Sequence, residues 1–432
     1  MKRRVDGLNP RKIWGITPLP YAIGTAAEEL MFSLLRAQSA GYRLLVLFPA
    51  DLWRSNGYRV YSQALACLDS SSIIKLPKSV TICLRLILSL IYLPGRTLSR
   101  VLFACCGRRL PESFNFPRIG LGPLWKTSID ATSPPSQPMQ VFTWKERRQS
   151  FNPPHVSRPL EAVLKSNLEE LGVHPESWYV CLHVREGGFR KDDGRRDYRN
   201  ANILRYVKAI QHITDAGGWV VRLGDNSMTP LPVGMKQVID YPFTKQKSGL
   251  MDLYLIQNCR FYIGMLSGPW DIAELFKKDK LGINMYDCSA GFGYGDRDRS
   301  ICKHVFSYEK DRFLSLKELF ASGDDLMNIY GVTSDAYRYE ENTEEEIAEA
   351  VMNYLRLIEE NDDVINELQA EARRYWKRHA WERLMTGNIT GNAGARMKRI
   401  QEFRMSAKIE MAEVIIDPTY LQKNWDHDSF RP

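Results

Sequence analysis

Three apolar runs that each end in polar residues decide the fold: WYVCLHVREGG (178–188), WVVRLGD (219–225) and RFYIGMLSGPW (260–270). Each run is short and apolar at successive positions, which is typical of a strand that is buried between two layers of helices. Helical patterns separate the runs, among them ILRYVKAIQHITDAGG (203–218). Because strands that alternate with helices form parallel sheets, residues 151–335 are predicted to be a Rossmann-like α/β lobe.

A shorter block of the same kind precedes this lobe. IWGI (13–16) and YRLLVLF (42–48) have strand character, and the helical spacing of residues 25–41 lies between them. Residues 127–158 are rich in proline and serine without a sustained apolar period, so they are predicted to be a linker. Residues 1–150 are therefore predicted to be an N-terminal Rossmann-like lobe.

The last part of the chain has a different pattern. Residues 336–432 are predicted to form a helical C-terminal region, because apolar residues from Ile347 to Leu368 follow helical spacing. Thr343 and Glu346 have the spacing of a capping box and predict where the first helix begins. The charged runs around this spacing are interpreted as solvated faces.

Composition limits the classes of function. The 432 residues include 59 Lys+Arg and 51 Asp+Glu, a net charge of +8 that favours anionic ligands. A nucleic-acid role is not expected, because basic and aromatic residues are not interleaved along one face. The eight cysteines form no C-x-x-C pair, which argues against a disulfide scaffold or a structural zinc site and favours a reducing cytoplasmic compartment. No apolar core follows the opening MKRRV, so no signal peptide is predicted.

A basic and apolar insertion at about 75–126 has two interpretations. Its most apolar part, SVTICLRLILSLIYL (79–93), carries only Arg85 as a charge and is too short to span a membrane. Residues 79–106 could dock on an anionic membrane surface or form a helix buried between domains. The sequence leaves both alternatives open.

The polar residues after the runs predict an anion site. In open parallel sheets, ligands bind outside the carboxyl ends of the strands. His183 and Arg185 end the first run on one side of the strand, and Arg222 ends the second. Ser267 has the position of an N-cap with Pro269 in the first helical turn, so the backbone N–H groups there could bind a phosphate. Two arginines and a helix N-terminus at neighbouring strand ends predict a diphosphate site.

Carboxylates near this site are candidates for the general base of a group transfer. Glu186 and Asp197 follow the first run, and the N-terminal lobe offers Glu28 and Glu29. The predicted catalytic residues are Glu186, Asp197 and Glu29. Asp296 and Asp298, in the glycine-rich GFGYGDRDR (291–299), could instead hold Mg²⁺ or Mn²⁺, which would make the protein a metal-dependent transferase.

The order of these motifs from 178 to 285 resembles a family of bacterial glycosyltransferase-like proteins of surface-glycan synthesis, and more distantly the fucosyltransferase-like GT-B enzymes. The resemblance implies a GT-B fold whose second lobe binds a nucleotide-sugar. Arg185 and Ser267 would hold the donor diphosphate, with Arg222, Asp225 and Asn200 lining the donor pocket. The implied donor-binding residues are His183, Arg185, Asn200, Arg222, Asp225, Ser267 and Gly268.

The predicted function is therefore a glycosyltransferase of the hexosyltransferase type. It would move a sugar from a UDP-, GDP- or CMP-linked donor to a glycan or lipid-linked acceptor, in the cytoplasm at the inner face of the membrane. No metal and no further cofactor are expected, because the basic groove would neutralise the leaving diphosphate. Besides the metal-dependent alternative, a membrane-associated sugar-nucleotide-binding protein without catalysis stays open.

Overall fold

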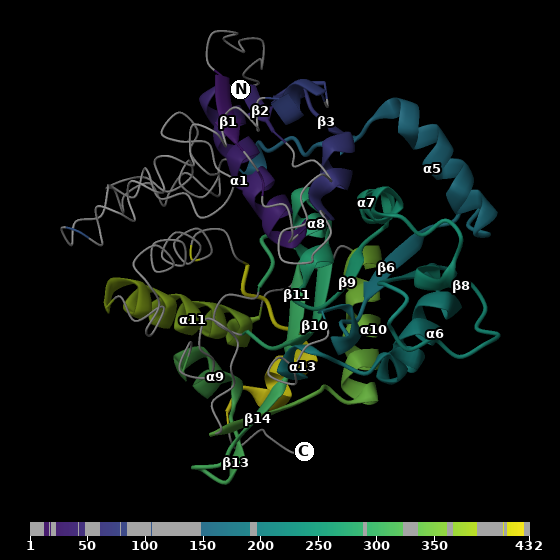
Figure 1. The fold of residues 1–432 in the computed structure, drawn as a ribbon. Helices are drawn as coiled ribbons and strands as arrows, with labels where there is room; N and C mark the ends of the chain where they lie inside the picture. Colours follow the sequence, from purple (N-terminus) through teal and green to yellow (C-terminus); the bar gives the residue numbers. More distant parts are fainter. Residues whose placement is uncertain are drawn as a thin grey trace. The chain divides into compact units, whose positions relative to one another are not determined.

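The protein folds as two α/β units in a computed structural model (Figure 1). Unit 1 is Met1–Arg158 and unit 2 is Pro159–Pro432. The structure describes residues 13–16, 18, 23–41, 43–47, 61–77, 79–83, 105, 148–190, 197–287, 292–322, 336–360, 366–386, 409 and 413–426. Both units contain a parallel sheet, which confirms the predicted α/β class.

A six-stranded sheet forms the centre of unit 2. Its strands are β6 (Tyr179–His183), β7 (Trp219–Leu223), β8 (Val238–Asp240), β9 (Tyr262–Gly264), β10 (Lys280–Met285) and β11 (Arg299–Cys302). They lie in the order β11-β10-β9-β6-β7-β8, and every neighbouring pair is parallel. All residues of β6, β9, β10 and β11 are buried, as expected for strands covered on both faces.

The strand order creates a switch point between β6 and β9. The chain runs from β6 outward to β7 and β8, and then returns to β9 on the other side of β6. This is the order of a dinucleotide-binding Rossmann sheet, in which ligands bind in the crevice at the carboxyl ends beside the switch point. The ends of β6 and β9 are therefore the first place to look for a site.

Four helices cover this sheet: α6 (Val207–Asp215), α7 (Gly249–Asn258), α8 (Gly268–Leu275) and α10 (Glu344–Glu360). Helix α10 packs along α6, and α7 packs on α8 (Figure 1). Because β-α-β crossovers are right-handed, helices before and after the reversal of strand order in the sheet lie on opposite faces. Helix α10 thus belongs to the packing of unit 2, although it follows the sheet in the sequence.

The rest of unit 2 contains a second sheet and further helices. An antiparallel sheet contains β12 (His304–Ser307), β13 (Arg312–Phe313) and β14 (Tyr337–Glu340). The remaining helices are α5 (Arg158–Glu170), α9 (Leu316–Ser322), α11 (Glu367–Thr386) and α13 (Pro418–Asn424). Just before α13, Ile416 forms a parallel bridge to Ser300 of β11. Ser300 N donates to Ile415 O at 3.1 Å, and Asp417 N donates to Ser300 O at 2.9 Å.

Unit 1 is a smaller α/β block. Its parallel sheet has the order β1 (Ile13–Ile16), β2 (Arg43–Val46) and β4 (Ile73–Ile74), and α1 (Ile23–Ala40) connects the first two strands. The helix ends at Gly41, whose φ of 69° is left-handed and suits glycine. The short strands β3 (Leu68–Asp69) and β5 (His155–Val156) pair antiparallel, and the 3-10 helix η1 (Tyr61–Cys67) precedes them.

The proposed membrane segment lies mostly outside the described residues. Of 79–106, the structure describes only 79–83, which are helical, and Cys105. Neither interpretation of this segment is tested. Over the ranges that the structure describes, no helix combines the length and the apolar character that crossing a bilayer requires.

The strands and helices expected from the three apolar runs are confirmed. The runs contain β6, β7 and β9, and α6 and α8 lie where helical patterns were predicted. The capping box is also present: Glu346 N donates to Thr343 Oγ1 at 3.2 Å, and Thr343 N donates to Glu346 Oε2 at 2.8 Å. Cys181 and Cys259 are free and buried, as expected for small core residues.

Candidate functional site

His183 and Ser267 meet at the switch point of unit 2. His183 is the last residue of β6, and Ser267 is the N-cap of α8 after β9. Ser267 Oγ lies 3.1 Å from His183 Nδ1 and donates to the backbone carbonyl of Met265 at 3.1 Å. The serine hydroxyl therefore makes no capping bond to α8, which differs from the predicted capping role. Ser267 instead ties the ends of the two central strands together.

His183 is held in its neutral form. Burial, together with the nearby charges of Arg222, Lys247 and Arg185, lowers the pKa of His183 to about 3. A neutral imidazole can donate through one nitrogen and accept through the other. At neutral pH it therefore supports Ser267 by hydrogen bonding and adds no charge to the edge of the sheet.

Arg185 and Asn200 form a side-chain pair beside this contact. Asn200 Oδ1 accepts a short hydrogen bond from Arg185 Nη1. Asn200 Nδ2 donates to Asp197 Oδ1 at 3.1 Å, so the amide is fixed from both ends. The backbone closes the arrangement, because Ala201 N donates to Arg185 O at 2.9 Å. The structure therefore brings together Arg185, Asn200 and Asp197, which the sequence separates by up to fifteen positions.

Further cations gather at the same carboxyl edge. Lys303 follows β11 and donates through Nζ to Asn200 O at 2.5 Å. Arg205 lies in the 3-10 helix η6 (Ile203–Tyr206) and donates to the carbonyls of Glu341 and Asn342 at 3.4 and 3.2 Å. Arg199 donates to the carbonyl of Leu266 at 3.4 Å, one residue before Ser267. We call Arg185, Arg199, Arg205 and Lys303 the cationic cluster.

Aromatic rings lie on one side of the cationic cluster. The Arg199 guanidinium lies 5.1 Å from the ring centre of Tyr286, which follows β10. Tyr198 packs edge-on against Tyr286 with 5.2 Å between ring centres, and against Tyr339 at 5.6 Å. A guanidinium over an aromatic face is attracted by the electrons of the ring. Tyr286 thus fixes Arg199 near the end of β9.

Arg222 of β7 pairs with Glu186, which follows β6. The Arg222 side chain is 0% exposed and contacts Glu186 Oε1 at 3.2 Å and Asp240 Oδ1 at 2.8 Å. Glu186 Oε2 also accepts from the backbone N and the hydroxyl of Thr229, at 2.7 and 3.0 Å. A buried arginine shared by two carboxylates fixes the loops after β6, β7 and β8. It is not exposed to line a donor pocket, which corrects that expectation for Arg222.

The turns after β6 and β7 also differ from expectation. Asp225 Oδ1 accepts from the backbone N of Ser227 at 2.9 Å and from its hydroxyl, so this carboxylate shapes its own turn. Gly188, in the turn after β6, packs against the turn after β7. A Cβ atom at Gly188 would lie 2.5 Å from Ser227 Oγ, so this glycine makes room for the neighbouring turn.

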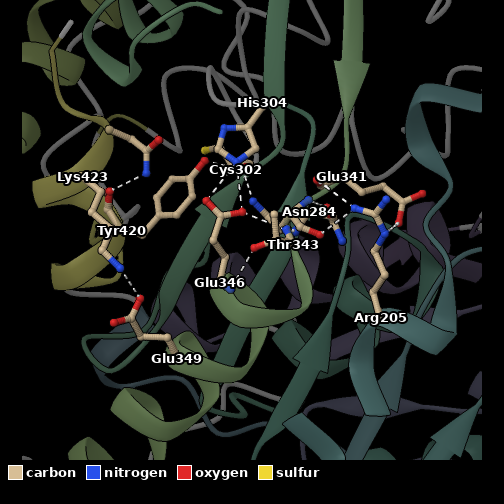
Figure 2. A network of polar contacts seen from close by, with 12 residues as sticks. Arg205, Asn284, Cys302, His304, Glu341, Thr343, Glu346, Glu349, Tyr420 and Lys423 are labelled. Atoms are coloured by element: carbon tan, nitrogen blue, oxygen red, sulfur yellow. Dashed lines mark hydrogen bonds and ion pairs between the residues drawn. The ribbon is translucent and has the colours of Figure 1, made fainter. Parts of the chain in front are cut away.

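A polar network fixes the beginning of α10 to the sheet (Figure 2). Asn284 N donates to Asn342 Oδ1 at 2.9 Å, and Asn342 N donates to Asn284 Oδ1 at 2.7 Å. Asn284 has a left-handed φ of 55°, which this exchange requires and asparagine tolerates. On the other side, His304 Nε2 lies 2.9 and 3.0 Å from the two oxygens of Glu346. Both contacts place Glu341 beside the cationic cluster.

The Asp-x-Asp motif forms no metal site in this arrangement. Asp298 is 1% exposed, and its Oδ2 lies 3.1 Å from the ammonium of Lys280, which also contacts Glu274. Its two oxygens accept from the backbone N of Lys280 at 2.9 Å and of Gly295 at 2.8 Å. Asp296 is exposed. A carboxylate that is buried against a lysine does not fit a metal ligand, so the motif anchors the glycine-rich loop.

Two predicted residues remain to be placed. Gly268 is the first residue of α8, next to Ser267. Glu29 lies on α1 of unit 1 and is 5% exposed. Across the described ranges, no group of three or more His, Cys, Asp or Glu side chains could hold a metal ion.

Sequence reasoning missed Lys303, Arg205 and Glu341. Lys303 follows the buried strand RSIC (299–302), whose first two residues are polar and do not resemble a core strand. If this strand had been recognised, the rule that ligands bind at carboxyl ends would have pointed to Lys303. Arg205 and Glu341 carry no signal in the sequence, because their contact joins positions 136 residues apart.

Comparison with known proteins gives structural similarity only. No protein-family model matches the chain, and no curated protein sequence matches it. Among solved structures, the chain is similar to ADP-heptose LPS heptosyltransferase II of E. coli. The identity is 13% and the TM-score 0.36, over 67% of this chain and 90% of that one.

Two other solved structures show similarity of the same kind. The glycosyl transferase family 9 protein of Veillonella parvula DSM 2008 has 10% identity and a TM-score of 0.39, over 82% of this chain and 99% of that one. The iron-containing dodecameric glycosyltransferase TibC of enterotoxigenic E. coli H10407 has 12% identity and a TM-score of 0.30, over 65% and 59%. Scores this low do not establish shared function, which must be inferred from the residues of this chain.

Proposed function

We propose that the protein is a glycosyltransferase with a nucleotide-sugar donor, and that unit 2 binds the diphosphate of this donor at the carboxyl ends of β6 and β9. The observation that carries the proposal is the contact between His183 and Ser267 across the switch point, with the Arg185–Asn200 pair beside it. A Rossmann sheet binds dinucleotide-like ligands at this place. The GT-B arrangement of the two units is part of the proposal.

The cationic cluster supplies the charge that a diphosphate requires. A guanidinium presents several N–H donors in one plane and pairs well with phosphate oxygens. The bond to Asn200 fixes the orientation of Arg185, and α8 begins at Gly268 with the positive end of its dipole at this edge. When the sugar is transferred, the leaving diphosphate gains negative charge that Arg185 and its neighbours would stabilise.

The general base in this proposal is Asp197 rather than Glu186. Both carboxyl groups follow β6, but Glu186 is bound by Arg222 and Thr229. Asp197 is exposed, and its Oδ1 accepts a hydrogen bond from Asn200 Nδ2. Asn200 also binds Arg185, so this one residue connects the carboxylate to the arginine. A carboxylate that is exposed near the donor can take the proton of an acceptor hydroxyl. Glu29 stays a second proposal for the base, supplied by unit 1.

The acceptor in this proposal is a glycan or a lipid-linked sugar in surface-polysaccharide synthesis, reached in the cytoplasm at the inner membrane face. This part follows the resemblance of the motifs, and the basic net charge of +8 suits an anionic membrane. One of the similar structures, the heptosyltransferase TibC, is a complex with ADP-D-β-D-heptose. Adenosine diphosphate therefore belongs among the nucleotides to be tested.

Nucleotide binding tests the proposal directly. Titration calorimetry of the whole protein with UDP, GDP, ADP and CMP should show binding of one nucleotide. Arg185→Ala should weaken that binding about 10- to 100-fold, because a charged hydrogen bond contributes roughly 1.5–3 kcal/mol. Arg260→Ala is the matched control: Arg260 precedes β9, at the other end of the strand, and stacks on Trp178 at 4.5 Å. It should leave the affinity unchanged.

A second variant separates nucleotide binding from catalysis, when the titration is combined with an assay of sugar transfer. Asp197→Asn should keep the nucleotide Kd within about threefold and abolish sugar transfer, because a general base contributes roughly 10²–10⁴-fold to the rate. The proposal is overturned if no nucleotide binds, or if Arg185→Ala and Arg260→Ala weaken binding equally.

A further inference from the structure

Lys303 is a buried lysine at the carboxyl edge of the sheet. It follows the last residue of β11, and its backbone N donates to Met285 O of β10 at 3.0 Å. The residue is 2% exposed. Its ammonium donates to the backbone carbonyl of Asn200 at 2.5 Å. A buried lysine needs such a partner, because an unpaired buried charge is costly.

Asn200 connects this lysine to Arg185. Its carbonyl accepts from Lys303, and its side chain accepts from the Arg185 guanidinium. The peptide that carries this carbonyl also supplies Ala201 N, which donates to Arg185 O at 2.9 Å. Lys303 therefore holds the peptide between Asn200 and Ala201, which binds the backbone of Arg185 and adjoins the side chain that binds the Arg185 guanidinium.

The groups around Lys303 make its charge sensitive to pH. Burial is the main cause that lowers the pKa of Lys303, to about 8; Arg205 of η6 and Arg185 after β6 lower it further, and Glu341 before α10 opposes them. Its chain neighbours are the buried Cys302 and His304, which contacts Glu346. Asn202 N donates to Glu341 Oε2 at 2.8 Å, so this carboxylate has a fixed place.

We propose that Lys303 is a positioning residue for the donor: its ammonium holds the carbonyl of Asn200, and Asn200 in turn holds Arg185 against the diphosphate. This inference rests on the proposed function, because it names the residue that prepares Arg185 for that ligand. Lys303 belongs to none of the motifs in the sequence. Its effect acts through Asn200 and Arg185 rather than through contact with the sugar.

The proposal gives nucleotide binding a distinctive dependence on pH. The pKa of Lys303 in the free protein is about 8. An added dianion at Arg185 would raise the pKa, because negative charge nearby favours the ammonium. Binding then takes up a proton in alkaline solution, so affinity is constant below about pH 7.5 and falls as the pH rises through 8. A pKa difference of one unit corresponds to about a tenfold loss of affinity.

The experiment measures nucleotide Kd against pH for the whole protein and three variants. The probe is the nucleotide that the wild-type protein binds most tightly in the panel of UDP, GDP, ADP and CMP. Lys303→Met removes the ammonium and keeps most of the volume, and Lys303→Arg keeps a charge that does not titrate in this range. Lys208→Met is the matched control, since it removes an ammonium that is exposed and pairs with Glu345 at 3.7 Å.

The wild-type protein and Lys208→Met should bind up to about tenfold more weakly at about pH 9.5 than at about pH 7. Lys303→Met should bind about 5- to 10-fold more weakly at neutral pH and show no further loss at alkaline pH. Lys303→Arg should keep most of the neutral affinity with a flat profile. This rescue by charge distinguishes positioning from a folding defect, and circular dichroism of each variant measures the folded fraction.

Two results would overturn the inference. Lys303→Met could keep the wild-type affinity and the wild-type pH profile, in which case another group titrates. Alternatively, Lys303→Arg could lose nucleotide affinity at alkaline pH as the wild-type protein does, which would also mean that another group titrates. Failure of the proposed function is a separate outcome, because the wild-type protein would then bind none of the nucleotides at neutral pH.

Discussion

At the scale of single residues, His183 couples the site to the stability of unit 2. Its pKa is about 3 in the folded protein, because burial and the charge of Arg222 disfavour the imidazolium. In the unfolded chain a histidine titrates near 6.5. Between these values the unfolded state binds one proton more than the folded state. The free energy of unfolding therefore rises with pH in this window. The stability that neutral His183 contributes decreases as the pH falls below about 6.5.

This sign gives a measurable prediction. Between about pH 6.5 and pH 5 the titration of His183 should cost the wild-type protein about 2 kcal/mol of stability. His183→Asn keeps a hydrogen-bonding side chain near Ser267 but cannot titrate. Urea unfolding at several pH values measures the free energy of unfolding, which should depend less steeply on pH in this variant than in the wild-type protein. Equal slopes would contradict a neutral, buried His183.

The capping box of α10 is an interaction at the scale of elements. Burial is the largest single effect and would raise the pKa of Glu346, but the hydrogen bond and electrostatic interaction with His304 and the bonds from Thr343 together outweigh it and lower the pKa below its usual value. The charged carboxylate therefore joins the first turn of α10 to β12. The helix begins where the sequence predicts because a side chain, and not only apolar spacing, fixes its first turn.

Removing this contact should destabilise unit 2. Glu346→Ala loses the bonds to Thr343 N and to His304, and we expect the free energy of unfolding to fall by about 1–2 kcal/mol. Glu345→Ala is the control one residue earlier, since the Glu345 side chain is 73% exposed. It should change stability by less than about 0.5 kcal/mol. Urea midpoints measure both, and equal losses would mean that the capping box contributes nothing specific.

The strands of the six-stranded sheet show which elements a sequence can predict. Strands β6, β7 and β9 were predicted because each is a continuous apolar run with a clear end. Strand β10 contains Gly282 and Asn284, and β11 begins with Arg299 and Ser300, so neither has the pattern of a core strand although both are buried. Polar residues in these two strands are bound by partners far along the chain, Asn284 by Asn342 and Ser300 by Ile415.

The site was predictable to a similar extent. Strand ends located His183, Arg185 and Ser267 on one edge, because parallel strands bring their carboxyl ends together. Which arginine would be buried could not be predicted: Arg222 pairs with Asp240, a partner supplied by the next strand. Alternation along a strand gives the side of a residue but not the partner that reaches it from another loop.

For the whole molecule, the proposed function predicts that sugar transfer does not require a divalent metal ion. In the proposed reaction the cationic cluster would contribute the positive charge that a divalent ion supplies in metal-dependent transferases, and Asp298 is paired with Lys280. Sugar transfer should therefore persist in about millimolar EDTA, with kcat within about twofold of the untreated protein. The measurement is nucleotide release in a coupled assay. Activity that disappears in EDTA and returns with Mg²⁺ or Mn²⁺ would contradict this prediction.

The bridge between Ser300 and Ile416 has a consequence for the behaviour of the protein in solution. An outer strand normally leaves a row of backbone donors and acceptors that a strand of another molecule can join. Here the residues before α13 already hydrogen-bond to Ser300 of β11 on that side. Residues 415–417 thus occupy the backbone groups of β11 at Ser300, so a strand of another molecule cannot pair with this edge at that position.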